Sequence, residues 1–234
     1  MVVISRFYGT LLEKRPLTSS VLLLSFRIPE GFTFKAGQYV ILSMMQGEEK
    51  KFKPYSILNP PSKKGVIDLC VKIIDGGFAS QGFKLMTVGQ EVEIKGPFGH
   101  FVFDQESSLN EHWFIGAGTG IAPLYSMLKE NLDSNLENKF RLIVGFRSKE
   151  DLLFHEELNS LSLSHKNFIY LPTLSREERS EWKGARGRVQ QHLGKDLQKK
   201  VFYLCGLKEL VLETKEYLLQ QGIYPVRIKF ERYN

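Results

Sequence analysis

A glycine-rich turn near the middle of the chain has residue types that can hold phosphate groups: Gly116, Gly118 and Gly120. The apolar residues 113–115 before it predict a buried strand, and the segment after it predicts a helix. Residues without a Cβ atom let backbone N–H groups approach a pyrophosphate, and the positive end of a following helix favours its negative charge. The same pattern also occurs in simple tight connections. We nevertheless expect a dinucleotide phosphate site at this turn, formed by the three glycines together with Thr119.

Upstream of this turn, Lys53, Pro54, Tyr55 and Ser56 bring a cation, an aromatic ring and a hydroxyl group together on a predicted strand. A flavin site uses these three types. The cation neutralises phosphate, the ring lies against the sugar or the isoalloxazine, and the hydroxyl can hydrogen-bond flavin N5. A strand end whose tyrosine packs in the core would contain the same residues, so both interpretations stay open on this segment alone.

A second glycine turn, at residues 77–80, follows a predicted strand and opens a predicted helical turn. It consists of Gly77, Phe78, Ala79 and Ser80. Its backbone N–H groups and the Ser80 hydroxyl could receive a further phosphate group. A plain glycine turn is equally compatible with these residues.

The composition is that of a globular protein, with 42% hydrophobic and 25% charged residues among 234. No apolar run reaches the ~18 residues that span a bilayer, and no secretory signal is visible, so we expect a cytoplasmic protein. Cys70 and Cys205 are the only cysteines, too few for an iron–sulfur cluster, and the histidines lack metal-binding spacing. We therefore expect an organic redox cofactor. We place the five histidines at the surface or in linkers: His100, His112, His155, His165 and His192.

Basic residues are concentrated in the N-terminal part, where Lys and Arg outnumber Asp and Glu by 13 to 8 up to Phe103. Such an excess can attract an acidic macromolecule or only solvate a face. Lys50, Lys51 and Lys53 form the one tight basic group, which we expect in a hairpin turn. Because the other basic residues are scattered, nucleic acid is not an expected partner.

Residues 1–103 and residues 112–234 differ in the periodicity of their apolar side chains. The first part has short β-rich runs at residues 19–28, 38–44, 67–74 and 91–94, which predict an antiparallel barrel or sandwich. The second part alternates apolar strands with helices, which predicts a doubly wound parallel sheet with helices on both faces. The strands are expected at residues 113–115, 140–146, 167–172 and 201–205, and the helices at 121–132, 150–161, 187–193 and 207–221. A polar linker at residues 104–111 separates the two predicted domains.

Eight short motifs follow one another along nearly the whole chain, and their order resembles the ferredoxin–NADP(+) reductase family. They are Lys-Pro-Tyr-Ser-Ile at 53–57, Gly-Phe-Ala-Ser at 77–80, Gly-Pro-Phe-Gly at 96–99, Gly-Thr-Gly-Ile-Ala-Pro at 118–123, Gly-Phe-Arg at 145–147, Ser-Arg-Glu at 175–177, Cys-Gly at 205–206 and Phe-Glu-Arg-Tyr at 230–233. The resemblance implies a flavin-binding antiparallel β-barrel at residues 1–103 and an α/β domain at residues 112–234 that binds a nicotinamide dinucleotide.

For the barrel, the resemblance implies that Tyr55 stacks on the flavin, that Ser56 contacts N5, and that Lys53 and the turn at residues 77–80 hold the phosphates. The family usually has arginine at the position of Lys53. Lysine supplies a point charge without the planar fork that grips a phosphate in two places. We expect FAD rather than FMN, because the glycine turn offers a place for the pyrophosphate.

For the second domain, the resemblance implies that the turn at residues 118–120 lies at the pyrophosphate and that Cys205 and Gly206 lie near nicotinamide C4. The cysteine would shape hydride transfer through packing and polarity, without acting as a thiolate nucleophile. Glu231 stands two residues before Tyr233, whose ring in the family shields the flavin until the nicotinamide displaces it. Phe230 is the alternative ring.

Selection of NADP(H) over NAD(H) requires a cation that meets the 2′-phosphate of the nucleotide. The candidates are Arg176, which follows Ser175 after the predicted third strand of this domain, and Arg188. Arg147, at the end of the Gly-Phe-Arg motif, is expected to bind the cofactor. No acidic residue directly ends the predicted third strand of this domain, so we expect NADP(H), while Glu177 and Glu178 keep NAD(H) open.

We therefore expect a flavoenzyme that passes hydride between NADPH and FAD and exchanges single electrons with an acidic carrier protein such as ferredoxin or flavodoxin. Its expected catalytic residues are Ser56, Cys205 and Glu231. One alternative is an NADH-dependent reductase component of an oxygenase, or a free flavin reductase. Another is a non-catalytic flavin-binding regulatory subunit, although a binder needs none of those three residues. No membrane insertion is expected.

Overall fold

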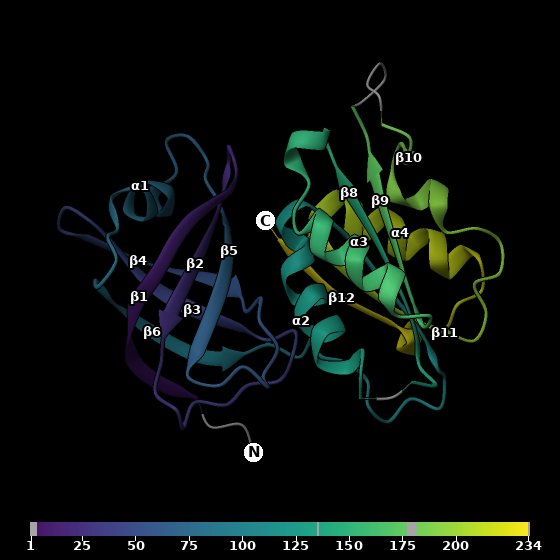
Figure 1. Ribbon diagram of the computed structural model, residues 1–234, viewed down its shortest axis with the longest axis horizontal. Helices are drawn as coiled ribbons and strands as arrows, with labels where there is room; N and C mark the ends of the chain where they lie inside the picture. The colour runs from purple at the N-terminus through teal and green to yellow at the C-terminus, as the bar shows by residue number, and fades with distance from the viewer. Residues whose placement is uncertain (1–3, 135, 177–181, 234) are drawn as a thin grey trace. The chain divides into compact units, whose positions relative to one another are not determined.

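The computed structural model describes residues 4–134, 136–176 and 182–233, which divide into two compact units (Figure 1). The first unit consists of Met1–Phe103 and Tyr125–Glu130, and the second of Asp104–Leu124 and Asn131–Asn234. Glu177 and Glu178, which bear on the expected choice of nucleotide, lie outside the described residues. No helix in the described part of the chain is long and apolar enough to cross a membrane.

An antiparallel sheet of six strands curls around the core of the first unit, in the order β4-β3-β6-β1-β2-β5 (Figure 1). The elements are β1 (Ser5–Thr18), β2 (Val21–Arg27), β3 (Tyr39–Gln46), β4 (Glu49–Ser56), β5 (Val66–Lys72), α1 (Phe78–Leu85) and β6 (Glu91–Phe98). The two edges of the sheet approach each other where Ile57 forms a β-bridge with Leu69. There the Leu58 N–H donates to the Asp68 carbonyl at 2.8 Å. The predicted antiparallel barrel is confirmed.

Alternating side chains of these strands build the core of the barrel. Along β3, Val40, Leu42 and Met44 are buried and belong to one hydrophobic cluster, whereas Met45 is exposed. This period of two is typical of a strand with one buried face. Strand β1 has no such clear pattern in the sequence, because the charged residues 13–15 interrupt it. Its backbone nevertheless pairs with both β2 and β6.

The tight basic group lies on a strand, so its expected place in a hairpin turn is wrong. The turn consists of the two residues between β3 and β4, and Gly47 there has a φ of 58°. Lys50, Lys51 and Lys53 follow it on β4, paired in register with β3. Three lysines are compatible with this strand because it is an edge of the sheet.

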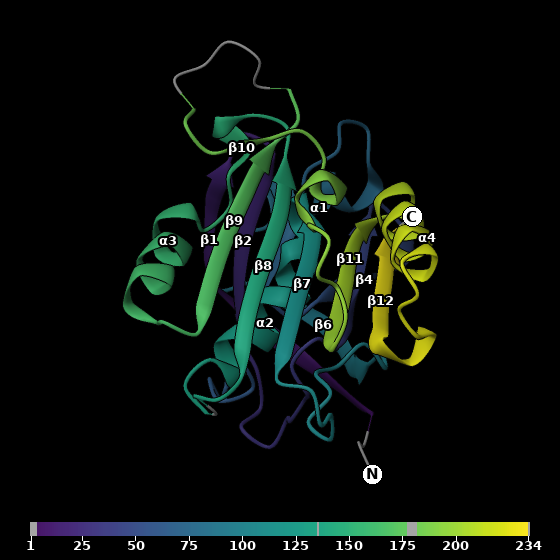
Figure 2. The ribbon, with the colours of Figure 1, turned by 90° about the vertical axis from the view of Figure 1, so that its right-hand side faces the viewer.

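The second unit contains a sheet of six strands in the order β10-β9-β8-β7-β11-β12, in which every neighbouring pair is parallel (Figure 2). Its strands are β7 (Glu111–Ala117), β8 (Lys139–Phe146), β9 (Phe168–Leu174), β10 (Ala185–Arg186), β11 (Lys200–Leu207) and β12 (Ile228–Tyr233). The α-helices that connect strands of this sheet are α2 (Ile121–Asn131), α3 (His155–Ser164) and α4 (Lys208–Gln220). The helix expected at residues 187–193 is a short 3-10 turn at Val189–His192.

The two faces of the parallel sheet carry different side chains. Trp113 and Phe202, which are paired across β7 and β11, share a cluster with Val211 and Leu218 of α4. On the other face, the Ser162 hydroxyl of α3 donates to the backbone of β9. Figure 2 shows α3 and α4 on opposite faces. The predicted doubly wound sheet is therefore confirmed.

His112 lies inside the second unit, so its expected surface position is wrong. Its side chain is 1% exposed, and its Nδ1 lies 3.3 Å from the Tyr203 hydroxyl, which also accepts a hydrogen bond from the Asp104 N–H at 3.1 Å. Its ring lies 5.7 Å from that of Phe140. Burial lowers the pKa of His112 to about 4, although Asp104 and Asn138 act in the opposite direction.

His112 makes stability depend on pH in a defined window. Because its folded-state pKa lies below the ordinary 6.5, the unfolded chain binds more protons as pH falls from 6.5 to about 4, and the folded state loses stability there. We expect the free energy of unfolding to fall by about 2 kcal/mol more between pH 7 and pH 5 in the native protein than in His112→Phe. Urea unfolding at both values measures this difference, and equal pH dependence in the two proteins would contradict it.

Candidate functional site

Strand β4 presents Lys53 and Tyr55 on one of its faces. Side chains two residues apart on a strand share a face, so Lys51 joins them there. The Tyr55 ring is half-buried and meets the Phe83 ring of α1 edge-on, with ring centroids 5.3 Å apart. Burial raises the pKa of the Tyr55 hydroxyl, so Tyr55 is a neutral aromatic surface. Ser56 is 7% exposed at the strand end.

Lys51 was missed as a candidate in the sequence. The signal was present, because positions 51, 53 and 55 alternate as a strand requires, but the expected turn concealed it. Its Nζ lies 4.4 Å from the centroid of the Phe78 ring, the first residue of α1. The structure thus brings Lys51, Lys53 and Tyr55 onto one face of β4, with Lys51 reaching the start of α1.

The start of α1 has the features of an anion-binding turn. Gly76 has a φ of 71°, which favours glycine, and Gly77 precedes the first helical residue. In the described structure no side chain caps this helix and its first turn carries no acidic residue. The first N–H groups of a helix lack partners within the helix, so those of α1 can bind phosphate oxygens. The predicted turn Gly77–Ser80 therefore fits a phosphate group.

Ser80 helps to shape this turn. Its hydroxyl accepts a hydrogen bond from the Ile74 N–H at 2.9 Å, and its side chain is 6% exposed. Ser80, which we expected to offer its hydroxyl to a phosphate, therefore also holds the turn together through this hydrogen bond. A Cβ atom at Gly77 would lie 3.0 Å from the Ile74 carbonyl oxygen, so the glycine is also needed for the close turn.

The glycine-rich turn of the second unit connects β7 to α2. Gly118, with a φ of 52°, starts a 3-10 turn that ends at Gly120. A Cβ atom at Gly118 would meet no described atom within 4 Å, whereas one at Gly120 would lie 2.5 Å from the Cys205 carbonyl oxygen. One at Gly116 would lie 3.0 Å from the same oxygen. Gly116 and Gly120 therefore allow strand β11 to pack closely against this turn. Of the residues in the turn, only Gly118 and Thr119 remain accessible to a ligand.

Cys205 stands between two strands that carry other predicted residues. In the parallel register it pairs with Gly116 of β7 on one side and with Glu231 of β12 on the other. The thiol is fully buried, and burial and then the charge of Glu231 raise its pKa, although a hydrogen bond with Tyr233 acts in the opposite direction. Cys205 is therefore a protonated thiol, and its expected role without a thiolate fits this environment. Gly206 follows with a φ of 149°.

Of the two candidate aromatic rings, the structure brings only Tyr233 next to Cys205. Tyr233 pairs with Leu207 at the end of β11 and hydrogen-bonds the thiol. Phe230 lies on the opposite face of β12, where Lys215 of α4 covers its ring with Nζ 4.3 Å from the centroid. The alternative ring is thus separated from this group of residues.

The predicted cofactor-binding residues near the ends of β8 and β9 fall into two groups. Arg147 and Arg176 are exposed beyond the ends of β8 and β9, and the Arg176 N–H donates to the Arg147 carbonyl at 2.9 Å. Ser175 is hydrogen-bonded to Phe146 in the same way. The Arg188 side chain forms an ion pair with Glu213 of α4, with Nη1 and Oε2 2.9 Å apart. The structure thus brings Arg147 and Arg176 together and gives Arg188 another partner.

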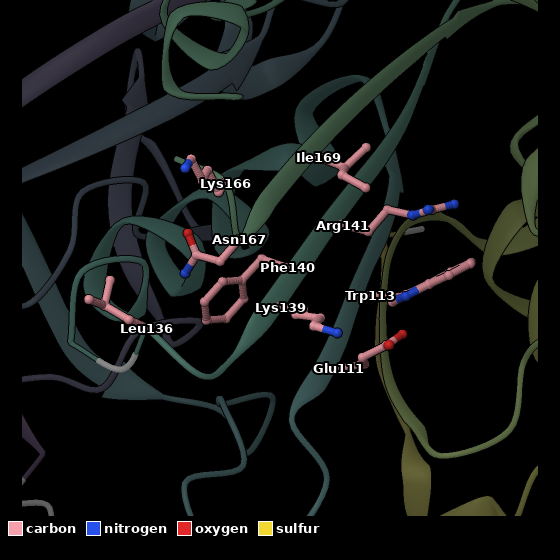
Figure 3. Close-up of a pocket in the computed structure, with 9 residues that line it drawn as sticks. All are labelled: Glu111, Trp113, Leu136, Lys139, Phe140, Arg141, Lys166, Asn167 and Ile169. Carbon is pink, nitrogen blue, oxygen red and sulfur yellow. The ribbon is translucent and has the colours of Figure 1, made fainter. Parts of the chain in front are cut away.

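A pocket of about 360 Å³ opens near the amino ends of the strands of this parallel sheet (Figure 3). Glu111, Lys139 and Asn167, which lie at the starts of β7, β8 and β9, are among its lining residues. Arg141 lies over the Trp113 ring there, 4.4 Å from its centroid. Open α/β sheets bind nucleotides at the carboxyl ends of their strands, where the glycine-rich turn and Cys205 lie. This pocket is therefore not the nucleotide site.

Comparison with known proteins agrees with this pair of binding regions. A protein-family model described as an oxidoreductase FAD-binding domain matches residues 9–103, and one described as an oxidoreductase NAD-binding domain matches residues 114–216. Ferredoxin–NADP reductase B of Sorangium cellulosum (strain So ce56) is 31% identical over 249 residues, which cover 100% of both chains. The chain belongs to the ferredoxin–NADP(+) reductase family. As a member, it is a flavoenzyme of NAD(P)H-linked electron transfer.

Other members of the reductase family resemble the chain over most of its length. The reductase component of phenol 2-monooxygenase from Pseudomonas sp. (strain CF600) is 30% identical over 93% of this chain and 62% of that protein. An Amycolatopsis cytochrome P450 reductase superposes with a TM-score of 0.91 and 25% identity, covering 99% of this chain and 71% of the other. A ferredoxin NADP+ reductase from Neisseria gonorrhoeae, at 21% identity, shares the fold with a TM-score of 0.85 over 97% of this chain and 98% of its own.

The packing of the glycine-rich turn against β11 predicts a large effect at Gly120. A Cβ atom there would lie 2.5 Å from the Cys205 carbonyl oxygen, so Gly120→Ala must displace backbone. We expect it to lower the free energy of unfolding by about 1–3 kcal/mol, as overpacking does. At Gly31 an added Cβ atom would meet no described atom within 4 Å, so Gly31→Ala is the control and should change it by less than about 0.5 kcal/mol. Equal effects in urea unfolding would contradict this account.

Proposed function

We propose that the enzyme transfers hydride between NADPH and FAD and passes single electrons to or from an acidic carrier protein such as ferredoxin or flavodoxin. The observation that carries the proposal is the group at the carboxyl edge of the parallel sheet, where Cys205 pairs with Gly116 and Glu231. Bound FAD would supply the conversion between two-electron and one-electron transfer. The proposed domains are residues 1–103 for the flavin and residues 112–234 for the nucleotide.

In the first unit, we assign flavin binding to the face of β4 and the start of α1. The neutral, half-buried Tyr55 ring offers a surface for the isoalloxazine, and Lys53 supplies a cation two residues away on the same face. The N–H groups after Gly77 bind phosphate oxygens in this proposal. Ser56, buried at the strand end, is assigned the hydrogen bond to flavin N5.

In the second unit, we assign the nucleotide pyrophosphate to Gly118 and Thr119, the open part of the glycine-rich turn. Cys205 is assigned to the nicotinamide. Its protonated, buried thiol excludes water and adds no charge, so it can shape the position of the ring without reacting with it. Glu231 lies beside it in register, and Tyr233 hydrogen-bonds the thiol in the structure described here. Nucleotide binding would then have to replace that contact of Tyr233.

The decisive experiment follows the bound flavin directly. The purified protein should be yellow and release FAD on denaturation, and NADPH should bleach its flavin absorbance under anaerobic conditions. Adding an oxidised ferredoxin should then return the absorbance, at a rate that falls as ionic strength rises, because salt screens the basic excess of the N-terminal part. A flavin that NADPH leaves oxidised would overturn the proposed reaction, and a rate independent of salt would overturn the acidic carrier.

A second candidate is a reductase component that feeds an oxygenase. It is favoured by the likeness to the reductase component of phenol 2-monooxygenase. The choice of coenzyme separates the two candidates, because the first predicts NADPH and the second, as stated above, NADH. Comparing kcat/KM for both coenzymes decides between them.

The adjacent Arg147 and Arg176 support NADPH, and their removal tests it. Arg176→Gln should raise the KM for NADPH about tenfold or more, since a charge-assisted hydrogen bond to phosphate is worth about 1.5–3 kcal/mol. The KM for NADH should stay unchanged because NADH lacks the 2′-phosphate. Lys195→Gln, an exposed lysine of the same unit, is the control. An equal rise in KM for NADPH and NADH would mean that Arg176 supports the structure and does not bind the 2′-phosphate.

A further inference from the structure

We propose that Lys51 is the cation for the second phosphate of FAD, and that it selects FAD over FMN. This inference rests on the proposed flavin site and adds to it a residue that the family motif does not contain. The motif supplies one cation, at the position of Lys53. In this chain that cation is a lysine, which lacks the two-point grip of an arginine.

Three side chains follow one another in a row along one face of β4. Tyr55, Lys53 and Lys51 share a face, and residues two apart on an antiparallel strand are separated by about 6.8 Å. The proposed site puts the isoalloxazine at Tyr55 and the first phosphate at Lys53. Lys51 then follows on the side away from the ring, where FAD has a second phosphate and FMN has ended.

The surroundings of Lys51 favour an anion beside it. Its Nζ lies 4.4 Å from the Phe78 ring centroid, at the first residue of α1. The amino end of a helix carries partial positive charge, so a lysine there is electrostatically unfavourable unless an anion joins it. In the described structure the first turn of α1 has no acidic residue. A phosphate would meet both the ammonium group and the helix N–H groups.

Within the described part of the chain, Lys51 has one carboxylate partner, and phosphate can replace it. Its Nζ lies 2.8 Å from Oε1 of Glu49, on the same face of β4. The side chains of Lys51 and Glu49 are 44% and 59% exposed. Exposed ion pairs of this kind contribute little to stability, so exchanging the Glu49 carboxylate for a doubly bound phosphate costs little.

Lys50 provides a matched control on the same strand. It is adjacent in sequence and of the same type, but it points to the opposite face, where its Nζ pairs with Glu93 Oε2 at 2.7 Å. Glu93 also forms an ion pair with Arg6, so Lys50→Gln leaves the Glu93 carboxylate a partner. A general loss of basic charge would affect both lysine variants alike, whereas the proposal affects only Lys51.

The experiment measures the dissociation constants of FAD, FMN and riboflavin with the full chain freed of flavin, by quenching of flavin fluorescence. Lys51→Gln should weaken FAD binding about tenfold or more and FMN binding less than about twofold, since only FAD has the second phosphate. Lys53→Gln should weaken both, Lys50→Gln neither, and riboflavin should bind all proteins alike. Lys51→Arg should retain the preference for FAD.

The outcomes separate this inference from the proposed function. If Lys51→Gln binds FAD as the native protein does, or weakens FAD and FMN equally while Lys51→Arg restores both, the assignment of Lys51 is wrong and the flavin site stands. Circular dichroism shows whether Lys51→Gln is folded. If it is not, the FAD and FMN dissociation constants of Lys51→Met are compared with those of Lys51→Arg instead. If the native chain binds none of the three flavins, the proposed function itself fails.

Discussion

The parallel pairing of β11 with its two neighbours is the constraint on which the second unit depends. Because β11 runs between β7 and β12, the Cys205 carbonyl lies where side chains of Gly116 and Gly120 would be. A side chain at residue 120 would therefore displace backbone, and one at residue 116 would crowd the same oxygen. The same pairing places Glu231 beside Cys205. One set of backbone hydrogen bonds thus holds the glycine-rich turn, the thiol and the carboxylate together at the carboxyl ends of the strands.

The two units differ in the charge of the groups around β4 and around Cys205. In the first, cations and helix N–H groups gather on one side of β4, which suits a ligand that carries negative phosphates. In the second, burial keeps the Cys205 thiol neutral next to the Glu231 carboxylate. A neutral thiol, unlike a thiolate, does not act as a nucleophile.

Family membership and side-chain geometry answer different questions about this chain. The match to FAD-binding and NAD-binding domains gives the class of reaction. The geometry distinguishes residues that the motifs treat alike. Arg147 and Arg176 lie together at the strand ends, whereas Arg188 is paired with Glu213. Likewise Tyr233, and not Phe230, reaches the cysteine.

The sequence by itself determined the two fold classes, the glycine positions and most strands, because these follow from local periodicity and backbone conformation. It missed strand β1, which the charged residues 13–15 hide and which pairs on both sides. Only the tertiary structure decided that His112 is buried, that Lys51 faces α1 and that Cys205 meets Glu231. These facts depend on which distant segments pair and in what register. That choice is made by long-range hydrogen bonds and packing, which spacing along the chain does not specify.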